Sequence, residues 1–415
     1  MNKEKGRVPK LRFPGFTEDW EQRKLTDIAK TFIGLVTTMT ENYRDSGTLL
    51  IRNSDIKEGQ FIFSEKPIHL DEEFAEKNKT RRLQIGDVVT VHTGDIGTSA
   101  VIKEKEAGAI GFATINTRTD KRILNPYFLS TYFNTEKHKC YANSVSTGDG
   151  RSNYNIKDFN KLVISIPTLD EQEKISALIN NINTIITLHQ RKLEHLNLKK
   201  KALLQNLFPK NGERYPELRF PGFTDAWEQR KLSDISTKVT TKNVDVHYTE
   251  TLTNSAEQGI ISQVDFFDKE ISNKDNINGY YIVENNDFIY NPRISTLAPV
   301  GPINRNKLNR TGIMSPLYTV FRASTVDLDF LDWYFQSSHW HRYMKLNGDS
   351  GARADRIAIK DSTFFDMLIK TPVNIKEQVL IGETLEKFNQ YITLHQRKLE
   401  HLQLQKKALL QQMFV

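Results

Sequence analysis

PKLRFPGFTEDWEQRKLTDIAK, residues 9–30, returns almost unchanged as PELRFPGFTDAWEQRKLSDIST at residues 216–237. The two segments agree at 16 of 22 positions when they are aligned at a shift of 207 residues. A second pair reads ITLHQRKLEHLNLKKKALLQNLF at 186–208 and ITLHQRKLEHLQLQKKALLQQMF at 392–414, with 19 of 23 positions identical. The stretches between the copies, about 150 residues each, scarcely resemble each other. A duplicated frame with different contents indicates two different surfaces on one pseudo-symmetric scaffold.

The longer runs that contain the second pair of segments, from Ile175 and from Ile381 onward, have the spacing of a coiled coil, with seam residues at alternating steps of four and three through more than four heptads. No proline interrupts either run, so we expect two helices of roughly 40 residues, each about 60 Å long. A long exposed helix with one apolar stripe needs a partner, and the nearest candidate is the other copy, paired antiparallel. The seam positions are Ile175, Ile179, Ile182, Ile186, His189, Leu193, Leu196, Lys200, Leu203 and Leu207, and then Ile381, Leu385, Phe388, Ile392, His395, Leu399, Leu402, Lys406, Leu409 and Met413.

Each half carries short strands and helices between its two frame segments. Turn residues bound the strand patterns, and two stretches have helical spacing at matching places. Strands are expected within 48–56, 59–63, 86–102, 161–167, 277–293, 312–322 and 367–372, helices within 125–142 and 327–345, and Gly-rich loops at 146–153 and 347–356. The pattern predicts a mixed α/β (α+β) fold with two pseudo-symmetric globular domains joined by two long antiparallel coiled-coil helices.

Composition limits the class of protein. A chain of 415 residues is too long for one ordinary domain, and its net charge of +7 fits a polyanionic partner without establishing one. The single cysteine, Cys140, excludes a disulfide framework and a cysteine-based zinc site. The basic N-terminus lacks an apolar segment, and no run of 18 apolar residues occurs, so we expect neither a signal peptide nor a membrane span and a cytoplasmic location.

The sequence offers no catalytic or metal site. His189 and His195, like His395 and His401, are six residues apart, about 240° around a helix, so neither pair can chelate one metal ion. The glycines of 93–98 lack the lysine and the spacing of a phosphate loop. Asn125-Pro126-Tyr127-Phe128 lacks the second proline of the amino-methyltransferase motif. We therefore expect no catalytic residue, no metal and no cofactor in this chain.

The Gly-rich loops are better candidates for function because they combine glycine with arginine. Glycine lets a loop approach a groove closely, and arginine contacts guanine or phosphate, although an ordinary solvated turn has the same composition. Together with polar residues at strand ends, they predict DNA contacts at Arg52, Asn53, His92, Thr93, Asn116, Arg118 and Arg151 in the first half, and at Asn254, Asn291, Arg293, Ser295, Ser315, Arg353 and Arg356 in the second.

Together these features resemble the specificity subunit of type I restriction-modification systems. The resemblance rests on the paired openings LRFPGFTEDW and LRFPGFTDAW, on the repeated HQRKLEHL helix, and on an IP-x-L-x-EQ-x-KI segment, and it covers essentially the whole chain. The residues of that segment are Ile166, Pro167, Leu169, Glu171, Gln172, Lys174 and Ile175. The second helix entry, TPVNIKEQVLI, keeps Pro372, Glu377 and Gln378 but lacks the leucine.

The resemblance implies two target-recognition domains, 1–166 and 218–371, each reading one half of a bipartite, asymmetric site in double-stranded DNA. Conserved helices at 167–208 and 372–415, with a linker at 209–217, would set the spacer and dock two methyltransferase subunits, and restriction/translocase subunits would join that core. S-adenosylmethionine, ATP and Mg²⁺ would belong to those partners, and this subunit would be non-catalytic. Residues beside the seam are assigned to the methyltransferase interface: Arg191, Lys192, Glu194, Arg397, Lys398 and Glu400.

Two other classes compete with this interpretation. One is a single-chain DNA methyltransferase or nuclease with built-in recognition domains, which methyl transfer by the purified chain alone would reveal. The other is a coiled-coil scaffold with no DNA role, against which the basic charge and the two unlike halves argue.

Overall fold

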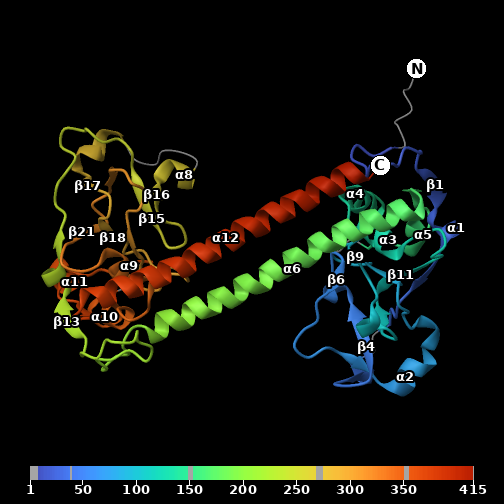
Figure 1. The fold of residues 1–415 in the computed structure, drawn as a ribbon, viewed down its shortest axis with the longest axis horizontal. Coiled ribbons are helices and arrows are strands. Elements are labelled where there is room, and N and C mark those ends of the chain that lie inside the picture. The colour runs from blue at the N-terminus through green and yellow to red at the C-terminus, as the bar shows by residue number, and fades with distance from the viewer. Residues whose placement is uncertain (1–7, 38–39, 148–152, 268–273, 350–354, 415) are drawn as a thin grey trace. The chain divides into compact units, whose positions relative to one another are not determined.

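The computed structural model describes residues 8–37, 40–147, 153–267, 274–349 and 355–414 (Figure 1). They form two compact units that do not follow chain order: unit 1 comprises Met1–Arg191 and Gln396–Val415, and unit 2 comprises Lys192–His395. The two long helices are α6 (Leu169–Asn206) and α12 (Ile375–Met413). Each unit therefore contains the beginning of one long helix and the end of the other.

Unit 1 is built on two four-stranded sheets. The first has the order β2-β11-β8-β9 and is antiparallel throughout, and the second has the order β10-β4-β7-β3 with β10 parallel to β4. The strands are β1 (Glu21–Lys24), β2 (Ala29–Ile33), β3 (Tyr43–Arg44), β4 (Thr48–Arg52), β5 (Ile56–Lys57), β6 (Gln60–Phe61), β7 (His69–Leu70), β8 (Val88–Val91), β9 (Ser99–Val101), β10 (Ile110–Phe112), β11 (Thr114–Thr119) and β12 (Val163–Ile166). The helices are α1 (Leu25–Ile28), α2 (Glu72–Lys77), α3 (Pro126–Phe133), α4 (Glu136–Val145) and α5 (Ile156–Phe159).

Unit 2 repeats the first of these sheets, because β14-β21-β18-β19 has the same order and directions as β2-β11-β8-β9. Its strands are β13 (Glu228–Lys231), β14 (Ser236–Lys238), β15 (Leu252–Ser255), β16 (Gly259–Ser262), β17 (Tyr281–Val283), β18 (Phe288–Tyr290), β19 (Ile303–Arg305), β20 (Gly312–Met314), β21 (Thr319–Ala323) and β22 (Leu368–Thr371). Its helices are α7 (Leu232–Ile235), α8 (Gln263–Phe267), α9 (Leu328–Gln336), α10 (His341–Asn347) and α11 (Asp361–Phe365). The predicted mixed α/β fold with pseudo-symmetric halves is confirmed.

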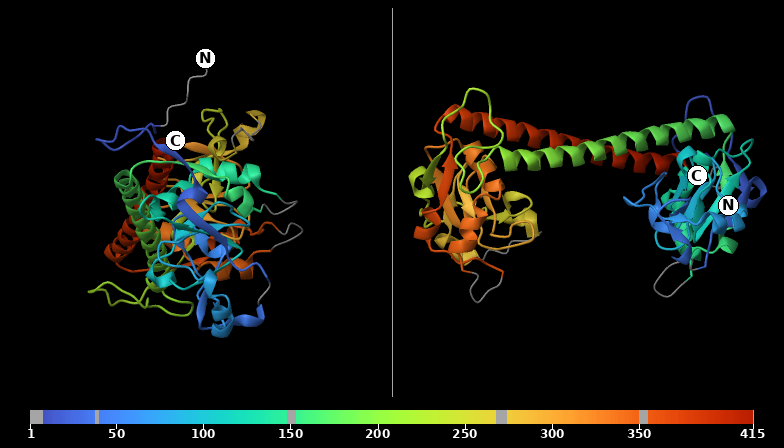
Figure 2. Two further views of the ribbon diagram at one scale, coloured as in Figure 1. Left: turned by 90° about the vertical axis from the view of Figure 1, so that its right-hand side faces the viewer. Right: turned by 90° about the horizontal axis from the view of Figure 1, so that it is seen from below.

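The predicted seam is the inward face of both long helices, since every one of its positions is buried or half-buried. In unit 1 Ile175 and Ile179 of α6 share a core with Leu410 and Met413 of α12. In unit 2 the end of α6, at Leu207, shares a core with Ile381 and Leu385 of α12. Within each unit the two helices are thus antiparallel, and Figure 2 shows these pairings from two further sides.

The polar seam residues bind partners instead of leaving gaps. Lys200 Nζ lies 2.8 Å from Asn389 Oδ1 and 4.7 Å from the ring centre of Trp333. The equivalent lysine, Lys406, donates to Glu58 at 3.0 Å. A polar seam position specifies register at a cost in stability, and here each lysine fixes one long helix within its unit.

The first frame segment docks on the start of a long helix through a bidentate ion pair. Arg12 Nε and Nη2 donate to the two carboxylate oxygens of Glu171 at 2.7 and 2.8 Å. Arg219 makes the same pair with Glu377, at 2.7 and 2.9 Å. Both carboxylates are almost inaccessible to solvent, at 0% and 1% exposure. The glutamates of the repeated EQ motif therefore hold the LRFPGF segments.

The glutamine of the same motif binds backbone that the frame must position. Gln172 Oε1 accepts from Asn125 N at 2.9 Å, and its Nε2 donates to Pro167 O at 2.9 Å. Gln378 does the same with Asp327 N and Pro372 O, both at 2.9 Å. Each glutamine thus joins the start of a long helix to the start of α3 or α9.

The far end of the other long helix completes each frame. Trp20 packs edge-on against Phe128 and Phe414, and Trp227 packs in the same way against Phe330 and Phe208. The backbone is joined as well, because Leu11 N donates to Gln412 O and Leu218 N donates to Asn206 O, both at 2.9 Å. All four near-identical segments of the sequence therefore meet at two equivalent places.

The structure differs from the prediction in the two helical stretches, since 125–142 and 327–345 each form two helices. The first breaks at Asn134, whose amide donates to Ser99 O and Ser130 O, and α4 restarts with Thr135 accepting from His138 N at 3.3 Å. In the second stretch, Ser337 Oγ donates a hydrogen bond to Tyr334 O at the end of α9. Side chains that form hydrogen bonds with nearby backbone groups can end a helix. The spacing of apolar residues in the sequence does not reveal such a break.

Loss of the frame ion pair should destabilise the fold strongly. We expect Arg12→Ala or Arg219→Ala to lower the free energy of unfolding by about 3–5 kcal/mol, because each leaves a buried carboxylate unpaired. Urea denaturation of the wild-type and variant chains measures this. The matched control is Arg122→Ala, which removes an exposed ion pair with Asp120 and should therefore change the free energy of unfolding far less. Equal losses in all three variants would contradict the assigned role.

Candidate nucleic-acid interface

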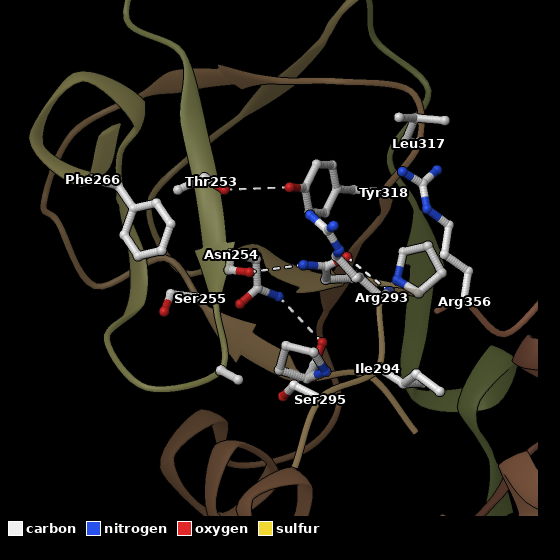
Figure 3. A pocket seen from close by; sticks show the side chains of 14 residues that line it. Thr253, Asn254, Ser255, Phe266, Arg293, Ile294, Ser295, Leu317, Tyr318 and Arg356 are labelled. Carbon is white, nitrogen blue, oxygen red and sulfur yellow. Dashed lines mark hydrogen bonds between the residues drawn. The ribbon is translucent and has the colours of Figure 1, made fainter. Parts of the chain in front are cut away.

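In unit 2 the predicted residues gather around one pocket of about 290 Å³ that lies beyond the end of β18. Figure 3 shows its lining, with Arg293, Arg356, Leu317 and Tyr318 along one side. Of the seven residues predicted for this half, five line it: Asn254, Asn291, Arg293, Ser295 and Arg356. Ser315 follows β20 outside this lining, and Arg353 lies outside the described residues.

Two of the five build the floor of the pocket. Asn254 is buried, donates to Ile289 O at 2.7 Å and accepts from Asn304 Nδ2 at 2.7 Å. Asn291 donates to Asn254 O at 2.9 Å and accepts from Arg293 N at 3.0 Å. Because their amides are committed within the fold, these asparagines position the pocket, and Arg293, Ser295 and Arg356 remain to meet a ligand.

The two arginines sit opposite each other across a short antiparallel bridge. Arg293 pairs with Arg356, flanked by hydrogen bonds from Ile357 N to Pro292 O and from Ile294 N to Asp355 O, both at 2.9 Å. This bridge fastens the segment after β18 to the end of the second Gly-rich loop. Asp355 Oδ2 lies 3.7 Å from Arg293 Nε and 3.9 Å from Arg356 Nε.

Unit 1 has the same arrangement after β8. Thr93 pairs with Asn153, and Tyr154 N donates to His92 O at 2.8 Å. His92 follows Asp87 by five residues, as Pro292 follows Asp287, and both aspartates accept from the backbone nitrogen three residues before them, at 2.8 Å. We call Thr93–Asn153 and Arg293–Arg356 the bridge pairs, since they occupy equivalent places in the two units.

Polar side chains surround the bridge pair of unit 1. His92 Nδ1 lies 2.8 Å from Thr93 Oγ1, and Thr93 Oγ1 donates to Asn153 Oδ1 at 2.8 Å. Asn53 Oδ1 accepts from His92 N at 3.2 Å. Burial lowers the pKa of His92, so its ring is neutral at neutral pH. Three predicted residues, Asn53, His92 and Thr93, therefore meet here.

Other predicted residues of unit 1 have structural roles. Arg118 binds both carboxylate oxygens of the buried Asp87 at 2.8 and 2.6 Å, and Arg52 binds those of the buried Asp55 at 3.1 and 3.0 Å. Asn116 is fully buried in β11 and has no surface to offer a base, so the prediction of a DNA contact there is withdrawn. Arg151 lies outside the described residues.

Arg322 in unit 2 is the counterpart of Arg118 and binds Asp287 at 2.7 and 3.0 Å. The hydrogen bonds to Asp287 raise the pKa of Arg322, although burial opposes this, and those to Asp87 do the same for Arg118. Sequence alone does not separate these arginines from Arg293, because the distinguishing feature is the burial of the carboxylate partner.

Sequence reasoning missed several residues at these places. Asn153 is two positions from the predicted Arg151, and its bridge to Thr93 joins distant segments. Phe266 and Leu317 line the pocket of unit 2 with exposed apolar side chains, and Tyr318 OH lies 3.3 Å from Thr253 Oγ1. Apolar side chains of this kind contact thymine methyl groups in DNA complexes, and their only sequence signal was their place after a strand.

The long helices carry a second surface beside the seam. All six residues predicted for the methyltransferase interface are exposed: Arg191, Lys192, Glu194, Arg397, Lys398 and Glu400. Exposed apolar residues lie near them at equivalent places in both copies: Ile185 and Tyr391, Leu188 and Leu394, and Leu198 and Leu404. Exposed apolar side chains that gather in a patch mark sites of protein interaction.

The helix pairing gathers these apolar residues within each unit. Lys200 bonds Asn389 in unit 2, and the equivalent residues, Lys406 and Asn183, line one pocket in unit 1. This register sets Leu404 opposite Ile185 in unit 1 and Leu198 opposite Tyr391 in unit 2. We call each set of three an apolar trio: Ile185, Leu188 and Leu404, and then Tyr391, Leu394 and Leu198.

In the described part of the chain, His, Cys, Asp and Glu side chains form no group of three that could hold a metal ion. None of the helices in that part combines the length and the apolar character needed to cross a membrane.

Comparison with known proteins agrees with this picture. A family model described as the type I restriction modification DNA specificity domain matches residues 17–198. The candidate MjaX specificity subunit of a type I restriction enzyme in Methanocaldococcus jannaschii is 26% identical over 198 residues, which span 46% of this chain and only 46% of that protein. The MjaVIII specificity subunit of the same organism is 20% identical over 362 residues, or 80% of this chain and 79% of that protein.

A solved structure shares the fold over the whole chain. It is the type I restriction-modification S subunit of M. genitalium, with a TM-score of 0.56 and 12% identity. The alignment covers 98% of this chain and 99% of that one.

Replacing an arginine that binds a buried carboxylate should destabilise the fold, whereas replacing an exposed arginine of the pocket should not. We expect Arg322→Gln to lower the free energy of unfolding by about 3 kcal/mol, because the buried Asp287 loses its counter-charge. Arg293→Gln should change it by less than about 0.5 kcal/mol, as is usual for an exposed side chain. Urea denaturation of the two variants provides the comparison, and a large loss for Arg293→Gln would show that this arginine is structural.

Proposed function

Since the chain belongs to the family of type I restriction-modification specificity subunits, we propose that it reads a split DNA site, one half with each unit. The supporting observation is that the bridge pairs occupy equivalent places on a shared frame but differ in chemistry, Thr93–Asn153 against Arg293–Arg356. Identical pairs would suit a palindrome, whereas unlike pairs suit an asymmetric site. The recognition domains are 1–166 and 218–371, as the sequence predicts.

The long helices are proposed to set the distance between the two half-sites. α6 and α12, with 38 and 39 residues, are each about 57–58 Å long at 1.5 Å per residue. Paired readers of DNA bind half-sites about 34 Å or a multiple of it apart, which is within the reach of such helices. The spacer itself would be unread.

Chemistry is proposed to come from partner subunits. Two methyltransferase subunits would dock on the apolar trios and the charged residues beside them, and restriction/translocase subunits would join that core. S-adenosylmethionine, ATP and Mg²⁺ would be bound by those partners, so the chain is not an enzyme by itself, and its place is the cytoplasm with the DNA. Purified alone with S-adenosylmethionine and DNA, it should transfer no methyl group.

Lengthening both helices should lengthen the spacer. Four residues inserted after Arg191 and four after Arg397, which are opposite in the helix register, add about 6 Å. This corresponds to one or two base pairs at about 3.4 Å each. Methylome sequencing of cells that carry the variant complex should show the original half-sites with the longer spacer. An unchanged spacer would refute the measuring role of the helices.

The apolar trios should each bind one methyltransferase subunit. We expect Leu188→Glu and Leu394→Glu each to reduce the number of bound methyltransferase subunits from two to one, and the double variant to bind none, because a buried charge opposes docking. Native mass spectrometry counts the subunits. Leu346→Glu, at an exposed leucine of α10, is the matched control and should keep both. Two subunits retained by the double variant would place the interface elsewhere.

A further inference from the structure

The bridge pair of unit 2 presents two guanidinium groups that the fold scarcely uses. Their ion pairs in the described part of the chain are with the exposed Asp355, at 3.7 and 3.9 Å. Such pairs contribute little to stability. By contrast Arg12, Arg52, Arg118, Arg219 and Arg322 each bind both oxygens of a buried carboxylate. Arg293 and Arg356 can therefore change partner at little cost.

Arg293 is the better placed of the two to reach a base. Its side chain is 68% exposed, whereas that of Arg356 is 32% exposed. The atom of the Arg293 guanidinium that Asp355 approaches is Nε, at 3.7 Å, and the side chain is largely exposed. Two parallel N–H donors match the O6 and N7 acceptors of guanine in the major groove. The bridge to the Gly-rich loop holds the backbone at this position, so the arginine side chain extends from a fixed Cα position.

The bridge pair of unit 1 holds an amide in one orientation. Because the single hydroxyl proton of Thr93 is donated to Asn153 Oδ1, the short contact between Thr93 Oγ1 and His92 requires a proton on Nδ1 of the histidine. In this arrangement Asn153 Oδ1 accepts from Thr93. Oδ1 has a second lone pair and Nδ2 has two N–H donors, and no other hydrogen bond of this side chain is found among the described residues. An asparagine that offers one acceptor and one donor matches N6 and N7 of adenine.

We infer that the bridge pair is the specificity-determining position of each unit, with Arg293 reading a guanine in one half-site and Asn153 reading an adenine in the other. Thr93 and His92 are positioning residues for Asn153, and the backbone bridge to Arg356 positions Arg293. The inference rests on the proposed function, because it assigns bases within half-sites that the function supposes.

The test uses the chain assembled with its methyltransferase partners. Methylome sequencing of the wild-type complex first defines the site. Binding is then measured at one fixed salt concentration for duplexes that carry every single base-pair change in both half-sites. The variants are Arg293→Gln and Asn153→Ala, and Arg342→Gln, an exposed arginine of α10 outside the pocket lining, is the control for loss of one positive charge.

Arg293→Gln should reduce discrimination about tenfold or more at one G·C pair of one half-site and leave the other half-site unaffected. Asn153→Ala should do the same at one A·T pair of the other half-site, and Arg342→Gln should keep the wild-type profile. A uniform loss of affinity for all sequences would make Arg293 a phosphate contact and overturn the inference, as would an unaltered profile, effects in the same half-site, or the same change in the control. A wild-type complex with no bipartite site defeats the proposed function itself, whereas a bipartite site with unaltered discrimination in the variants defeats only this inference.

Discussion

The rest of the structure depends on the bidentate pair between a frame arginine and the first-turn glutamate of a long helix, Arg12 with Glu171 and Arg219 with Glu377. A buried ion pair of this kind gives little net stability, yet breaking it is costly, so its effect is to exclude other arrangements. The pair fixes where the opening segment crosses the helix. The neighbouring glutamine then positions α3 or α9, and the tryptophan closes over the aromatic end of the other helix. Because every one of these groups is present in both copies, the two units are built by the same physical rule.

A few contacts link the frame to the surface that we propose reads DNA. β1 pairs with β12, and β13 pairs with β22. Since α6 follows β12 and α12 follows β22, each divergent stretch begins and ends next to the start of a long helix. Inside this enclosure the sheet β2-β11-β8-β9 recurs as β14-β21-β18-β19, and a buried aspartate before its central strand binds an arginine of the neighbouring strand in both units. The segment beyond that central strand is therefore presented at the same place twice. At the bridge pairs the chemistry of the two units differs although the bridges occupy equivalent places.

Much of this could be predicted from the sequence, for reasons that the structure makes plain. The seam residues were predictable because a helix buried on one face has apolar residues at regular steps of three and four. The same steps occur in both copies of the helix. Arg52 and Arg118 were not distinguishable from Arg293, because an arginine's role follows from whether its carboxylate partner is buried. Asp87 is 31 residues from Arg118, and although Asp55 is only three residues after Arg52, its burial is set by the fold. Asn116 failed as a candidate because alternation along β11 does not reveal that both faces of that strand are covered. Asn153 was missed because its partner, Thr93, is 60 residues away.

The central claim is that the two units share one frame and that the divergent stretches between the frame segments determine which DNA sequence is recognised. A chimera that carries the first recognition domain twice tests this claim. In it, residues 18–166 replace residues 225–371, so that both readers carry the Thr93–Asn153 bridge pair on an unchanged pair of long helices. The measurement is the methylated sequence, determined at base resolution, for the complex assembled with this chimera. The account predicts a symmetric site in which the half-site of unit 1 appears twice as an inverted repeat with the original spacer. Retention of the original asymmetric site would contradict it, since the replaced residues would then not have been the reader.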